Sequence, residues 1–186
     1  MTRPRLAVIV EGHGEESAAP ELLRRIAPGV EILRPHRVRK SKMPVDLARA
    51  VRFQSNRVGA AGGVLVLVDA DDDVPEELEG QLLRAIDDDL RSVARVVVAV
   101  KEYEAWFLAG IDSLRSHRSV RDDAAYAGDP ESPRDAKGRL ETQMVEPYQE
   151  TIHQVAFSAK VDLEAVAARC PSFVRLRDVV SDLLGS

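Results

Sequence analysis

The chain has 186 residues, of which 45% are hydrophobic and 31% charged, and its formal net charge is −5. These proportions are typical of a folded globular domain and exclude a disordered chain, and the negative net charge excludes a protein that attracts nucleic acid or acidic membranes through its overall charge. The single cysteine, Cys170, excludes an internal disulfide framework and a cysteine-rich zinc site, and we expect it to be a small buried side chain.

The apolar stretches set limits on location. None approaches the roughly 20 residues that are needed to span a bilayer. The apolar run near the N-terminus is also too short for a signal peptide and lacks a small-residue cleavage pattern. We therefore expect a cytoplasmic protein that has no membrane partner.

Strand-like and helix-like segments alternate over the first hundred residues. Runs of β-branched and apolar residues predict strands at 5–10, 30–35, 64–68 and 93–100. Apolar residues at helical spacing predict helices at 15–26, 46–53 and 75–90. This alternation predicts an α/β fold in which a parallel sheet of about four strands is flanked by helices.

The second half of the chain has a different character. Helical patterns occur at 102–115, 142–157 and 162–184, and residues 122–139 are rich in Asp, Pro and Gly and predict a surface loop or a lid-like insertion. Trp106 and Phe107 lie in the first of these helices at a spacing that favours core packing over base stacking. We expect residues 1–110 to form the core and residues 111–186 a helical extension packed on it, within a single compact domain.

Acidic residues follow three of the predicted strands. Glu11 follows the first, Asp69 and Asp71 follow the third, and Glu104 comes shortly after the fourth. Ligands of open parallel sheets bind beyond the carboxyl ends of the strands. Carboxylates are the ligands that Mg²⁺ and Mn²⁺ prefer, and clustered carboxylates need a compensating cation. The pattern therefore predicts a Mg²⁺ or Mn²⁺ site.

Acids that follow strands also have a structural interpretation. They serve as helix N-caps, or they lie in the first turn of a helix, where their negative charge interacts favourably with the helix dipole. Asp73 fits the first role and Glu15 the second, so for each acid alone both interpretations stay open. For Glu11, Asp69 and Asp71 together, the coincidence of acids at three strand ends favours a site.

Two motifs carry a family resemblance. "VIVEGHGEE" followed by "VLVLVDADDD" resembles the TOPRIM domain, which topoisomerases, bacterial primases and the overcoming-lysogenization-defect nucleases share. "KEYEAWFLAG" and "CPSFVRL" resemble a family of small bacterial TOPRIM-like proteins of unassigned function. The resemblance extends over the whole chain, with residues 5–100 as a TOPRIM-like core.

The resemblance implies a metal-dependent phosphoryl-transfer site with Glu11, Asp69 and Asp71 as its catalytic residues. Asp69 and Asp71 would hold Mg²⁺ or Mn²⁺, and Glu11 would share the ion or act as a general acid or base. Further acids would hold a second ion or support the first: Glu15, Asp73 and Glu104. The nuclease relatives imply cleavage of DNA or RNA, defence against phage and an ATPase partner. The chain has no topoisomerase tyrosine domain, primase zinc module or ATPase motif, so the reaction itself stays open.

Two segments are candidates for phosphate contact. Gly12 and Gly14 would let a substrate approach the N-terminus of a helix. His13 between them either contacts phosphate or helps proton transfer, or is a solvated turn residue. The stretch "RPHRVRKSK" concentrates positive charge in an otherwise acidic chain, which predicts nucleic-acid phosphate contacts or, equally, an exposed basic loop after an edge strand. Its basic residues are Arg34, Arg37, Arg39, Lys40 and Lys42.

Two functions follow from these patterns. The first is a Mg²⁺-dependent nuclease-like enzyme that acts on nucleic acid phosphodiesters. The second is a non-catalytic TOPRIM-like module that binds nucleic acid, a nucleotide or a partner protein in a regulatory role. The presence of metal-dependent cleavage distinguishes them.

Overall fold

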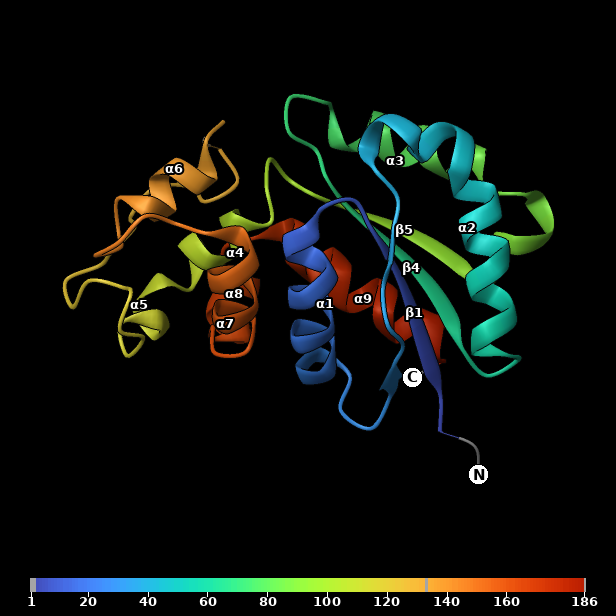
Figure 1. The fold of residues 1–186 in the computed structure, drawn as a ribbon, viewed down its shortest axis with the longest axis horizontal. Coiled ribbons are helices and arrows are strands. Elements are labelled where there is room, and N and C mark those ends of the chain that lie inside the picture. The colour runs from blue at the N-terminus through green and yellow to red at the C-terminus, as the bar shows by residue number, and fades with distance from the viewer. Residues whose placement is uncertain (1–2, 133, 186) are drawn as a thin grey trace.

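In residues 3–132 and 134–185, which the computed structural model describes, five parallel strands form one sheet. The strands are β1 (Arg5–Val10), β2 (Glu31–Ile32), β3 (His36–Arg37), β4 (Gly63–Asp69) and β5 (Ala94–Ala99). Their order is β2-β1-β4-β5, and β3 pairs with β1 as well. Figure 1 shows β1, β4 and β5 side by side. The predicted α/β class with a parallel, helix-flanked sheet is confirmed.

The register of the sheet brings the C-terminal ends of β1, β4 and β5 to the same side of the sheet, which we call its carboxyl edge or acidic edge. β1 runs beside β4 up to the pair Val10 and Leu67, and β4 runs beside β5 up to the pair Asp69 and Ala99. All of these pairings are parallel, so the residues that follow each strand leave the sheet on the same side. This edge is where Glu11 and Asp69 lie.

Of the strand predicted at 30–35 only Glu31–Ile32 is a strand, β2, and a second short strand, β3, follows the predicted segment. β2 pairs with the start of β1, and β3 pairs with its end, where Arg37 stands opposite Val10. Pro35 lies between the two strands and has no backbone N–H to donate to a ladder. The consequence is that the basic stretch enters the sheet directly beside the residue that precedes Glu11.

Helices cover both faces of the sheet (Figure 1). α2 (Met43–Val58) and α3 (Pro75–Ala85) pack on one face, where Ala7 and Ile9 of β1 point. α1 (His13–Ile26) and α9 (Pro171–Leu184) pack on the other, with Leu6, Val8 and Val10. Successive strand residues point to opposite faces, so the continuous apolar strands serve both layers.

Several predicted helix bounds are corrected. α1 begins two residues before the predicted start, and α2 extends beyond the prediction at both ends. α3 ends at Ala85 instead of residue 90 because Ile86 has extended backbone angles, and a 3₁₀ turn, η2 (Asp88–Leu90), follows. Another 3₁₀ turn, η1 (Lys40–Lys42), precedes α2.

The C-terminal region is more broken than predicted. The helix expected at 102–115 is divided at Gly110 into α4 (Glu104–Ala109) and α5 (Ile111–Leu114). The expected loop at 122–139 contains the start of α6 (Ala136–Glu141). The helix expected at 142–157 is helical only in the π-helix η3 (Glu150–Gln154) and in α7 (Val155–Ser158). The helix expected at 162–184 is divided into α8 (Leu163–Ala167) and α9, because Pro171 must stand in a first turn.

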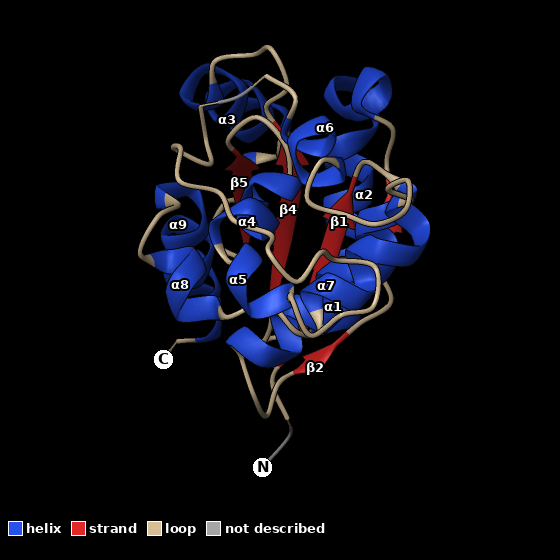
Figure 2. Ribbon diagram, turned by 90° about the vertical axis from the view of Figure 1, so that its left-hand side faces the viewer, coloured by secondary structure: helices blue, strands red, loops and turns tan. Residues whose placement is uncertain are grey.

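These C-terminal elements lie in front of the sheet in Figure 2, on the side that α1 occupies. Trp106, Phe107, Phe157 and Phe173 are buried together there, and their rings meet edge to face. The predicted core role of Trp106 and Phe107 and the predicted burial of Cys170 are therefore confirmed. In the part of the chain that the structure describes, no helix combines the length and the apolar character that crossing a membrane requires.

Candidate functional site

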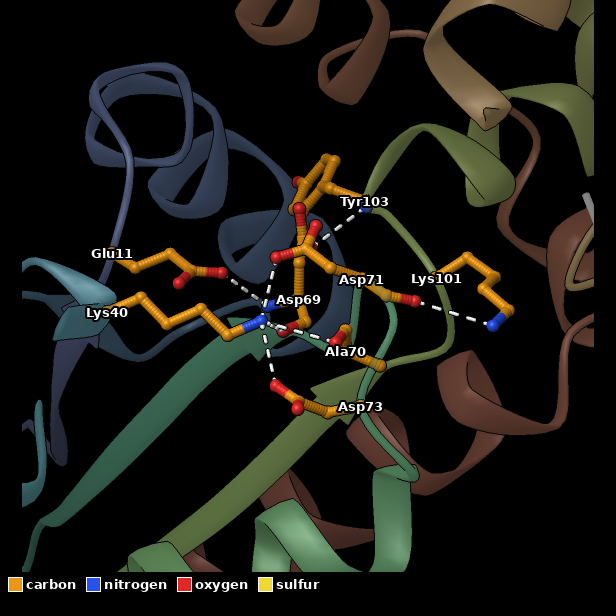
Figure 3. A network of polar contacts seen from close by, with 8 residues as sticks. All are labelled: Glu11, Lys40, Asp69, Ala70, Asp71, Asp73, Lys101 and Tyr103. Atoms are coloured by element: carbon orange, nitrogen blue, oxygen red, sulfur yellow. Dashed lines mark hydrogen bonds and ion pairs between the residues drawn. The ribbon is translucent and has the colours of Figure 1, made fainter. Parts of the chain in front are cut away.

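Glu11 and Asp69 meet at the carboxyl edge of the sheet (Figure 3). The backbone N–H of Asp69 donates to Oε1 of Glu11 at 2.7 Å, which joins the ends of β1 and β4. Oδ1 of Asp69 accepts the backbone N–H of Tyr103 at 2.9 Å, just before α4. Asp69 is only 7% exposed, so the predicted convergence of strand-end acids includes one that is almost fully buried.

Burial disfavours the ionised form of both carboxylates. The pKa of Asp69 is raised well above its usual value, first by burial and then by the negative charges of Glu104, Glu15 and Glu11. Burial also raises the pKa of Glu11, against the opposing effects of the Asp69 N–H and the charge of Lys40. A cation at this edge would relieve both costs.

The Lys40 ammonium group reaches the loop that follows β4 (Figure 3). Its Nζ donates to the carbonyl oxygens of Asp69 and Ala70 at 2.9 and 3.2 Å. It also donates to Oδ2 of Asp71 at 2.7 Å and lies 3.3 Å from Oδ2 of Asp73. Lys40, which the sequence pattern assigned to phosphate binding, is thus the cation that neutralises the two more exposed acids of the site.

The capping interpretation of Asp73 is wrong. The N-cap of α3 is Val74, and no side chain caps that helix. Asp73 faces Lys40 instead. Glu15 does lie in the first turn of α1, as its structural interpretation required, but it is buried and not solvated.

A second polar group lies beside the first and consists of Glu15, Gln154 and Glu104. Nε2 of Gln154 donates to Oε1 of Glu15 at 3.1 Å and to Oε1 of Glu104 at 3.2 Å. The Tyr148 hydroxyl donates to the same Glu104 oxygen at 2.8 Å. The second carboxylate oxygen of Glu15 and of Glu104, Oε2 in each, and the amide oxygen Oε1 of Gln154 are buried and have no hydrogen-bond partner among the described residues.

Such buried acceptors without donors are costly. Burial raises the pKa of Glu104 to about 7, against the positive charge of Lys137 and the hydrogen bond from Tyr148. The group is therefore poised either to take up a proton or to face a cation.

The glycine turn makes room for these side chains. A Cβ added to Gly12 would lie 2.1 Å from Oε2 of Glu15, and one added to Gly14 would lie 2.1 Å from Oε1 of Gln154. The side chain of His13 is largely exposed, with its ring 3.9 Å from the Glu16 carboxylate. The glycines thus permit the close approach of buried polar groups, and their contact with a phosphate stays a prediction.

The described residues contain no group of three or more His, Cys, Asp or Glu side chains arranged to hold an ion. The six predicted metal ligands nevertheless gather at one edge, in two neighbouring groups. Glu11, Asp71 and Asp73 lie around Lys40, and Glu15 and Glu104 lie around Gln154. The Asp69 carboxylate interacts with the charges of both groups. Carboxylate oxygens are the ligands that Mg²⁺ and Mn²⁺ prefer, and two of these oxygens are buried without a hydrogen-bond partner among the described residues, so the residues fit such an ion.

A family model described as "Domain of unknown function (DUF4276)" matches residues 10–180 of the chain. The protein is a member of the DUF4276 family. No curated protein matches its sequence significantly.

Solved structures give distant likenesses to this DUF4276 protein. The C-terminal region of the OLD protein of Xanthomonas campestris pv. campestris has 16% sequence identity and a TM-score of 0.44, and the match covers 95% of this chain and 96% of that one. The C-terminal region of the Burkholderia pseudomallei OLD protein has 17% identity and a TM-score of 0.41, over 96% of this chain and 100% of that one.

Three residues of this DUF4276 protein join the site without a sequence signal that assigns them to it. Gln154 and Tyr148 bind Glu104 from the C-terminal region, and Lys137 adds a positive charge while it pairs with Glu150 at 2.7 Å. Each lies more than 30 residues from the acid that it serves and follows no strand. Only the packing of the C-terminal region against α1 and α4 brings them there.

Proposed function

We propose that this protein is a Mg²⁺- or Mn²⁺-dependent phosphodiesterase of the nuclease type. The observation that carries the proposal is the gathering of six carboxylates at one edge of the sheet. Two of their oxygens are buried there and accept no hydrogen bond from the described residues. Uncompensated buried carboxylates destabilise a fold, and a hard divalent cation is a compensation that also performs chemistry.

The residues divide into two sets. Glu11, Asp69 and Asp71 would hold the catalytic ion, and Glu15, Asp73 and Glu104 would hold a second ion or support the first. A bound Mg²⁺ supplies stabilisation of the negative charge that develops on a phosphate during displacement. Lys40 lies among the carboxylates at this edge, and the basic stretch before it would fix the phosphates of DNA or RNA.

The proposal is tested by incubating the purified protein with single- and double-stranded DNA and RNA in Mg²⁺, Mn²⁺ or EDTA. Cleavage by wild type should require the metal and should fall by about 100-fold or more in Glu11→Gln and Asp71→Asn, as is typical when a group that stabilises the charge of the transition state is removed. Asp88→Asn is the matched control, because Asp88 is an exposed acid of η2 that is paired with Arg91. Cleavage that persists in both site variants would overturn the assignment.

The second candidate is a non-catalytic module that binds nucleic acid, a nucleotide or a partner protein. The observation that favours it is Lys40, which neutralises Asp71 and Asp73 without a metal. The module would bind its ligand equally well in EDTA and in Mg²⁺, and it would cleave none of the four substrates.

The motif resemblance alone supports a role in phage defence with an ATPase partner. Bacteria that express wild type should then resist phage plating, and bacteria that express Glu11→Gln should not. Affinity purification of the tagged wild-type protein from its host should recover an ATPase. Equal plating on both strains would remove this part of the proposal and leave the enzymatic part intact.

A further inference from the structure

A pocket of about 580 Å³ lies between the basic stretch and α2. Four of its lining residues are cationic: Arg37, Arg39, Lys42 and Arg49. Within the described ranges, the first three have no ion-pair partner, and Arg49 reaches only Asp46, at 3.4 Å. Asp46 is the one acidic residue among the described residues of the lining, so the four cations leave the pocket with a net positive charge that would attract an anion in a protein whose formal net charge is −5.

The pocket also has an aromatic wall. Phe53, on α2, is 56% exposed, and among the Phe, Tyr and Trp residues, all of which the structure describes, it is the one that is exposed. The ring of His36 lies 6.1 Å from it, tilted by 48°, and the Arg57 guanidinium lies 5.8 Å from its centroid. An exposed aromatic ring with cations around it is the arrangement on which nucleobases stack.

The position of the pocket relates it to the acidic edge. His36 and Arg37 form β3, which pairs with the last residues of β1, directly before Glu11. Lys40, between the pocket residues Arg39 and Lys42, reaches Asp71. The segment 36–42 therefore lines the pocket and also contacts the acidic edge, and a nucleic-acid strand that binds at both places would lie along this segment.

We propose that this pocket binds one nucleotide of a single-stranded nucleic acid, with the base stacked on Phe53 and the phosphate among Arg37, Arg39, Lys42 and Arg49. Its volume lies within the range of small-ligand sites. A base inside a duplex is covered on both faces by its neighbours and does not reach Phe53, so the pocket selects single strands. The inference deepens the proposed function by naming its substrate class, and the binding itself needs no metal.

Binding is measured by fluorescence anisotropy with a labelled 12-nucleotide single strand, as DNA and as RNA, and with the matching duplex, all in EDTA. Phe53→Ala should weaken single-strand binding on the order of 10-fold, and Phe53→Tyr should retain it, because tyrosine keeps the stacking face. Arg37→Gln combined with Arg39→Gln should weaken binding and reduce the slope of log K against log salt by roughly 0.7 for each phosphate that is no longer neutralised.

Two variants serve as controls. Val45→Ala alters the same helix at an exposed apolar residue that does not line the pocket, and Arg177→Gln removes a partly exposed arginine from α9. Both should bind as wild type does. Phe53 is exposed, so its truncation should leave the thermal midpoint close to that of wild type, which excludes unfolding as the cause of weaker binding.

Three results would overturn the proposal: equal affinity of wild type and Phe53→Ala for the single strand, equal affinity of wild type for the single strand and the duplex, or competition by a free mononucleotide at the same concentration as the unlabelled strand. Failure of the nuclease proposal is distinguishable. In that case binding in EDTA depends on Phe53, while no substrate is cleaved in Mg²⁺. In the converse case, cleavage depends on Glu11 but Phe53→Ala binds the single strand as wild type does. That result rejects the pocket proposal and leaves the nuclease proposal standing.

Discussion

Asp71 and Lys101 join the loops after β4 and β5 while both residues have left-handed backbone conformations. Their φ angles are 51° and 64°, and they are the described non-glycine residues with positive φ. The backbone N–H of Asp71 donates to the carbonyl oxygen of Lys101 at 2.7 Å, and Nζ of Lys101 returns to the carbonyl oxygen of Asp71 at 3.4 Å. Residues other than glycine adopt this conformation at a cost, and such strain gathers at functional sites.

This strain predicts a stability difference between two substitutions of Lys101. Lys101→Gly should raise the free energy of unfolding by roughly 1 kcal/mol relative to Lys101→Ala, because glycine has no Cβ to oppose a positive φ. Both variants lack the Nζ hydrogen bond, so their difference reports the backbone alone. Urea unfolding followed by circular dichroism measures it. Equal stability of the two variants would show that the left-handed conformation carries no strain.

We expect the Lys40 ammonium group to compete with divalent ions for the carboxylates of the site. Lys40→Met should bind Mn²⁺ several-fold more tightly than wild type in calorimetric titration, because the variant removes a positive charge that contacts Asp71 and lies close to Asp73. Lys42→Met is the control, since Lys42 is exposed and makes no ion pair within the described ranges. Identical affinities for the two variants would contradict this role of Lys40.

Gly14 predicts a stability difference between two glycine positions. Gly14→Ala should lower the free energy of unfolding by about 1–3 kcal/mol, because the new Cβ would overlap Gln154, which is fully buried. Gly80→Ala, in the middle of α3, should instead raise it by about 0.5–1 kcal/mol, since only the end of the exposed Arg84 side chain lies close by. Urea unfolding of both variants checks the signs, and a neutral Gly14→Ala would refute the packing argument.

Glu104 predicts a fall in stability as the pH rises. Burial raises its pKa from 4.5 to about 7 in the folded protein, so the folded state binds more protons than the unfolded state between these values. The free energy of unfolding contributed by this group therefore decreases from about pH 4.5 to pH 7, by on the order of 3 kcal/mol, and is constant above.

The measurement is metal-free urea unfolding of wild type and Glu104→Gln at several pH values between 5 and 8. Glutamine retains an acceptor for Tyr148 and does not titrate, so the variant should gain stability over wild type as the pH rises. Parallel curves for the two proteins would show that Glu104 does not bind the extra proton.

The apolar strands and the acids after them were predictable because each rests on local chemistry. The runs that form β1, β4 and β5 are buried on both faces, so they read as continuous apolar segments, and the acids at their ends stand where parallel strands bring ligands. The C-terminal helices were predicted less well. Apolar spacing there is interrupted at Gly110 and Pro171, and the stretch before Glu150 is held by a contact with a distant residue, the hydrogen bond from Tyr148 to Glu104.

The sequence by itself determined the layered α/β fold and the edge of the sheet at which Glu11, Asp69 and Asp71 stand, because hydrophobic periodicity and the alternation of strands with helices are local properties. Only the tertiary structure decided which groups face those acids. Lys40 arrives through the pairing of β3 with β1, and Gln154 arrives through the packing of η3 on α1. Interactions between residues that are about 30 to 139 positions apart depend on how whole elements pack, and no spacing in the chain encodes them.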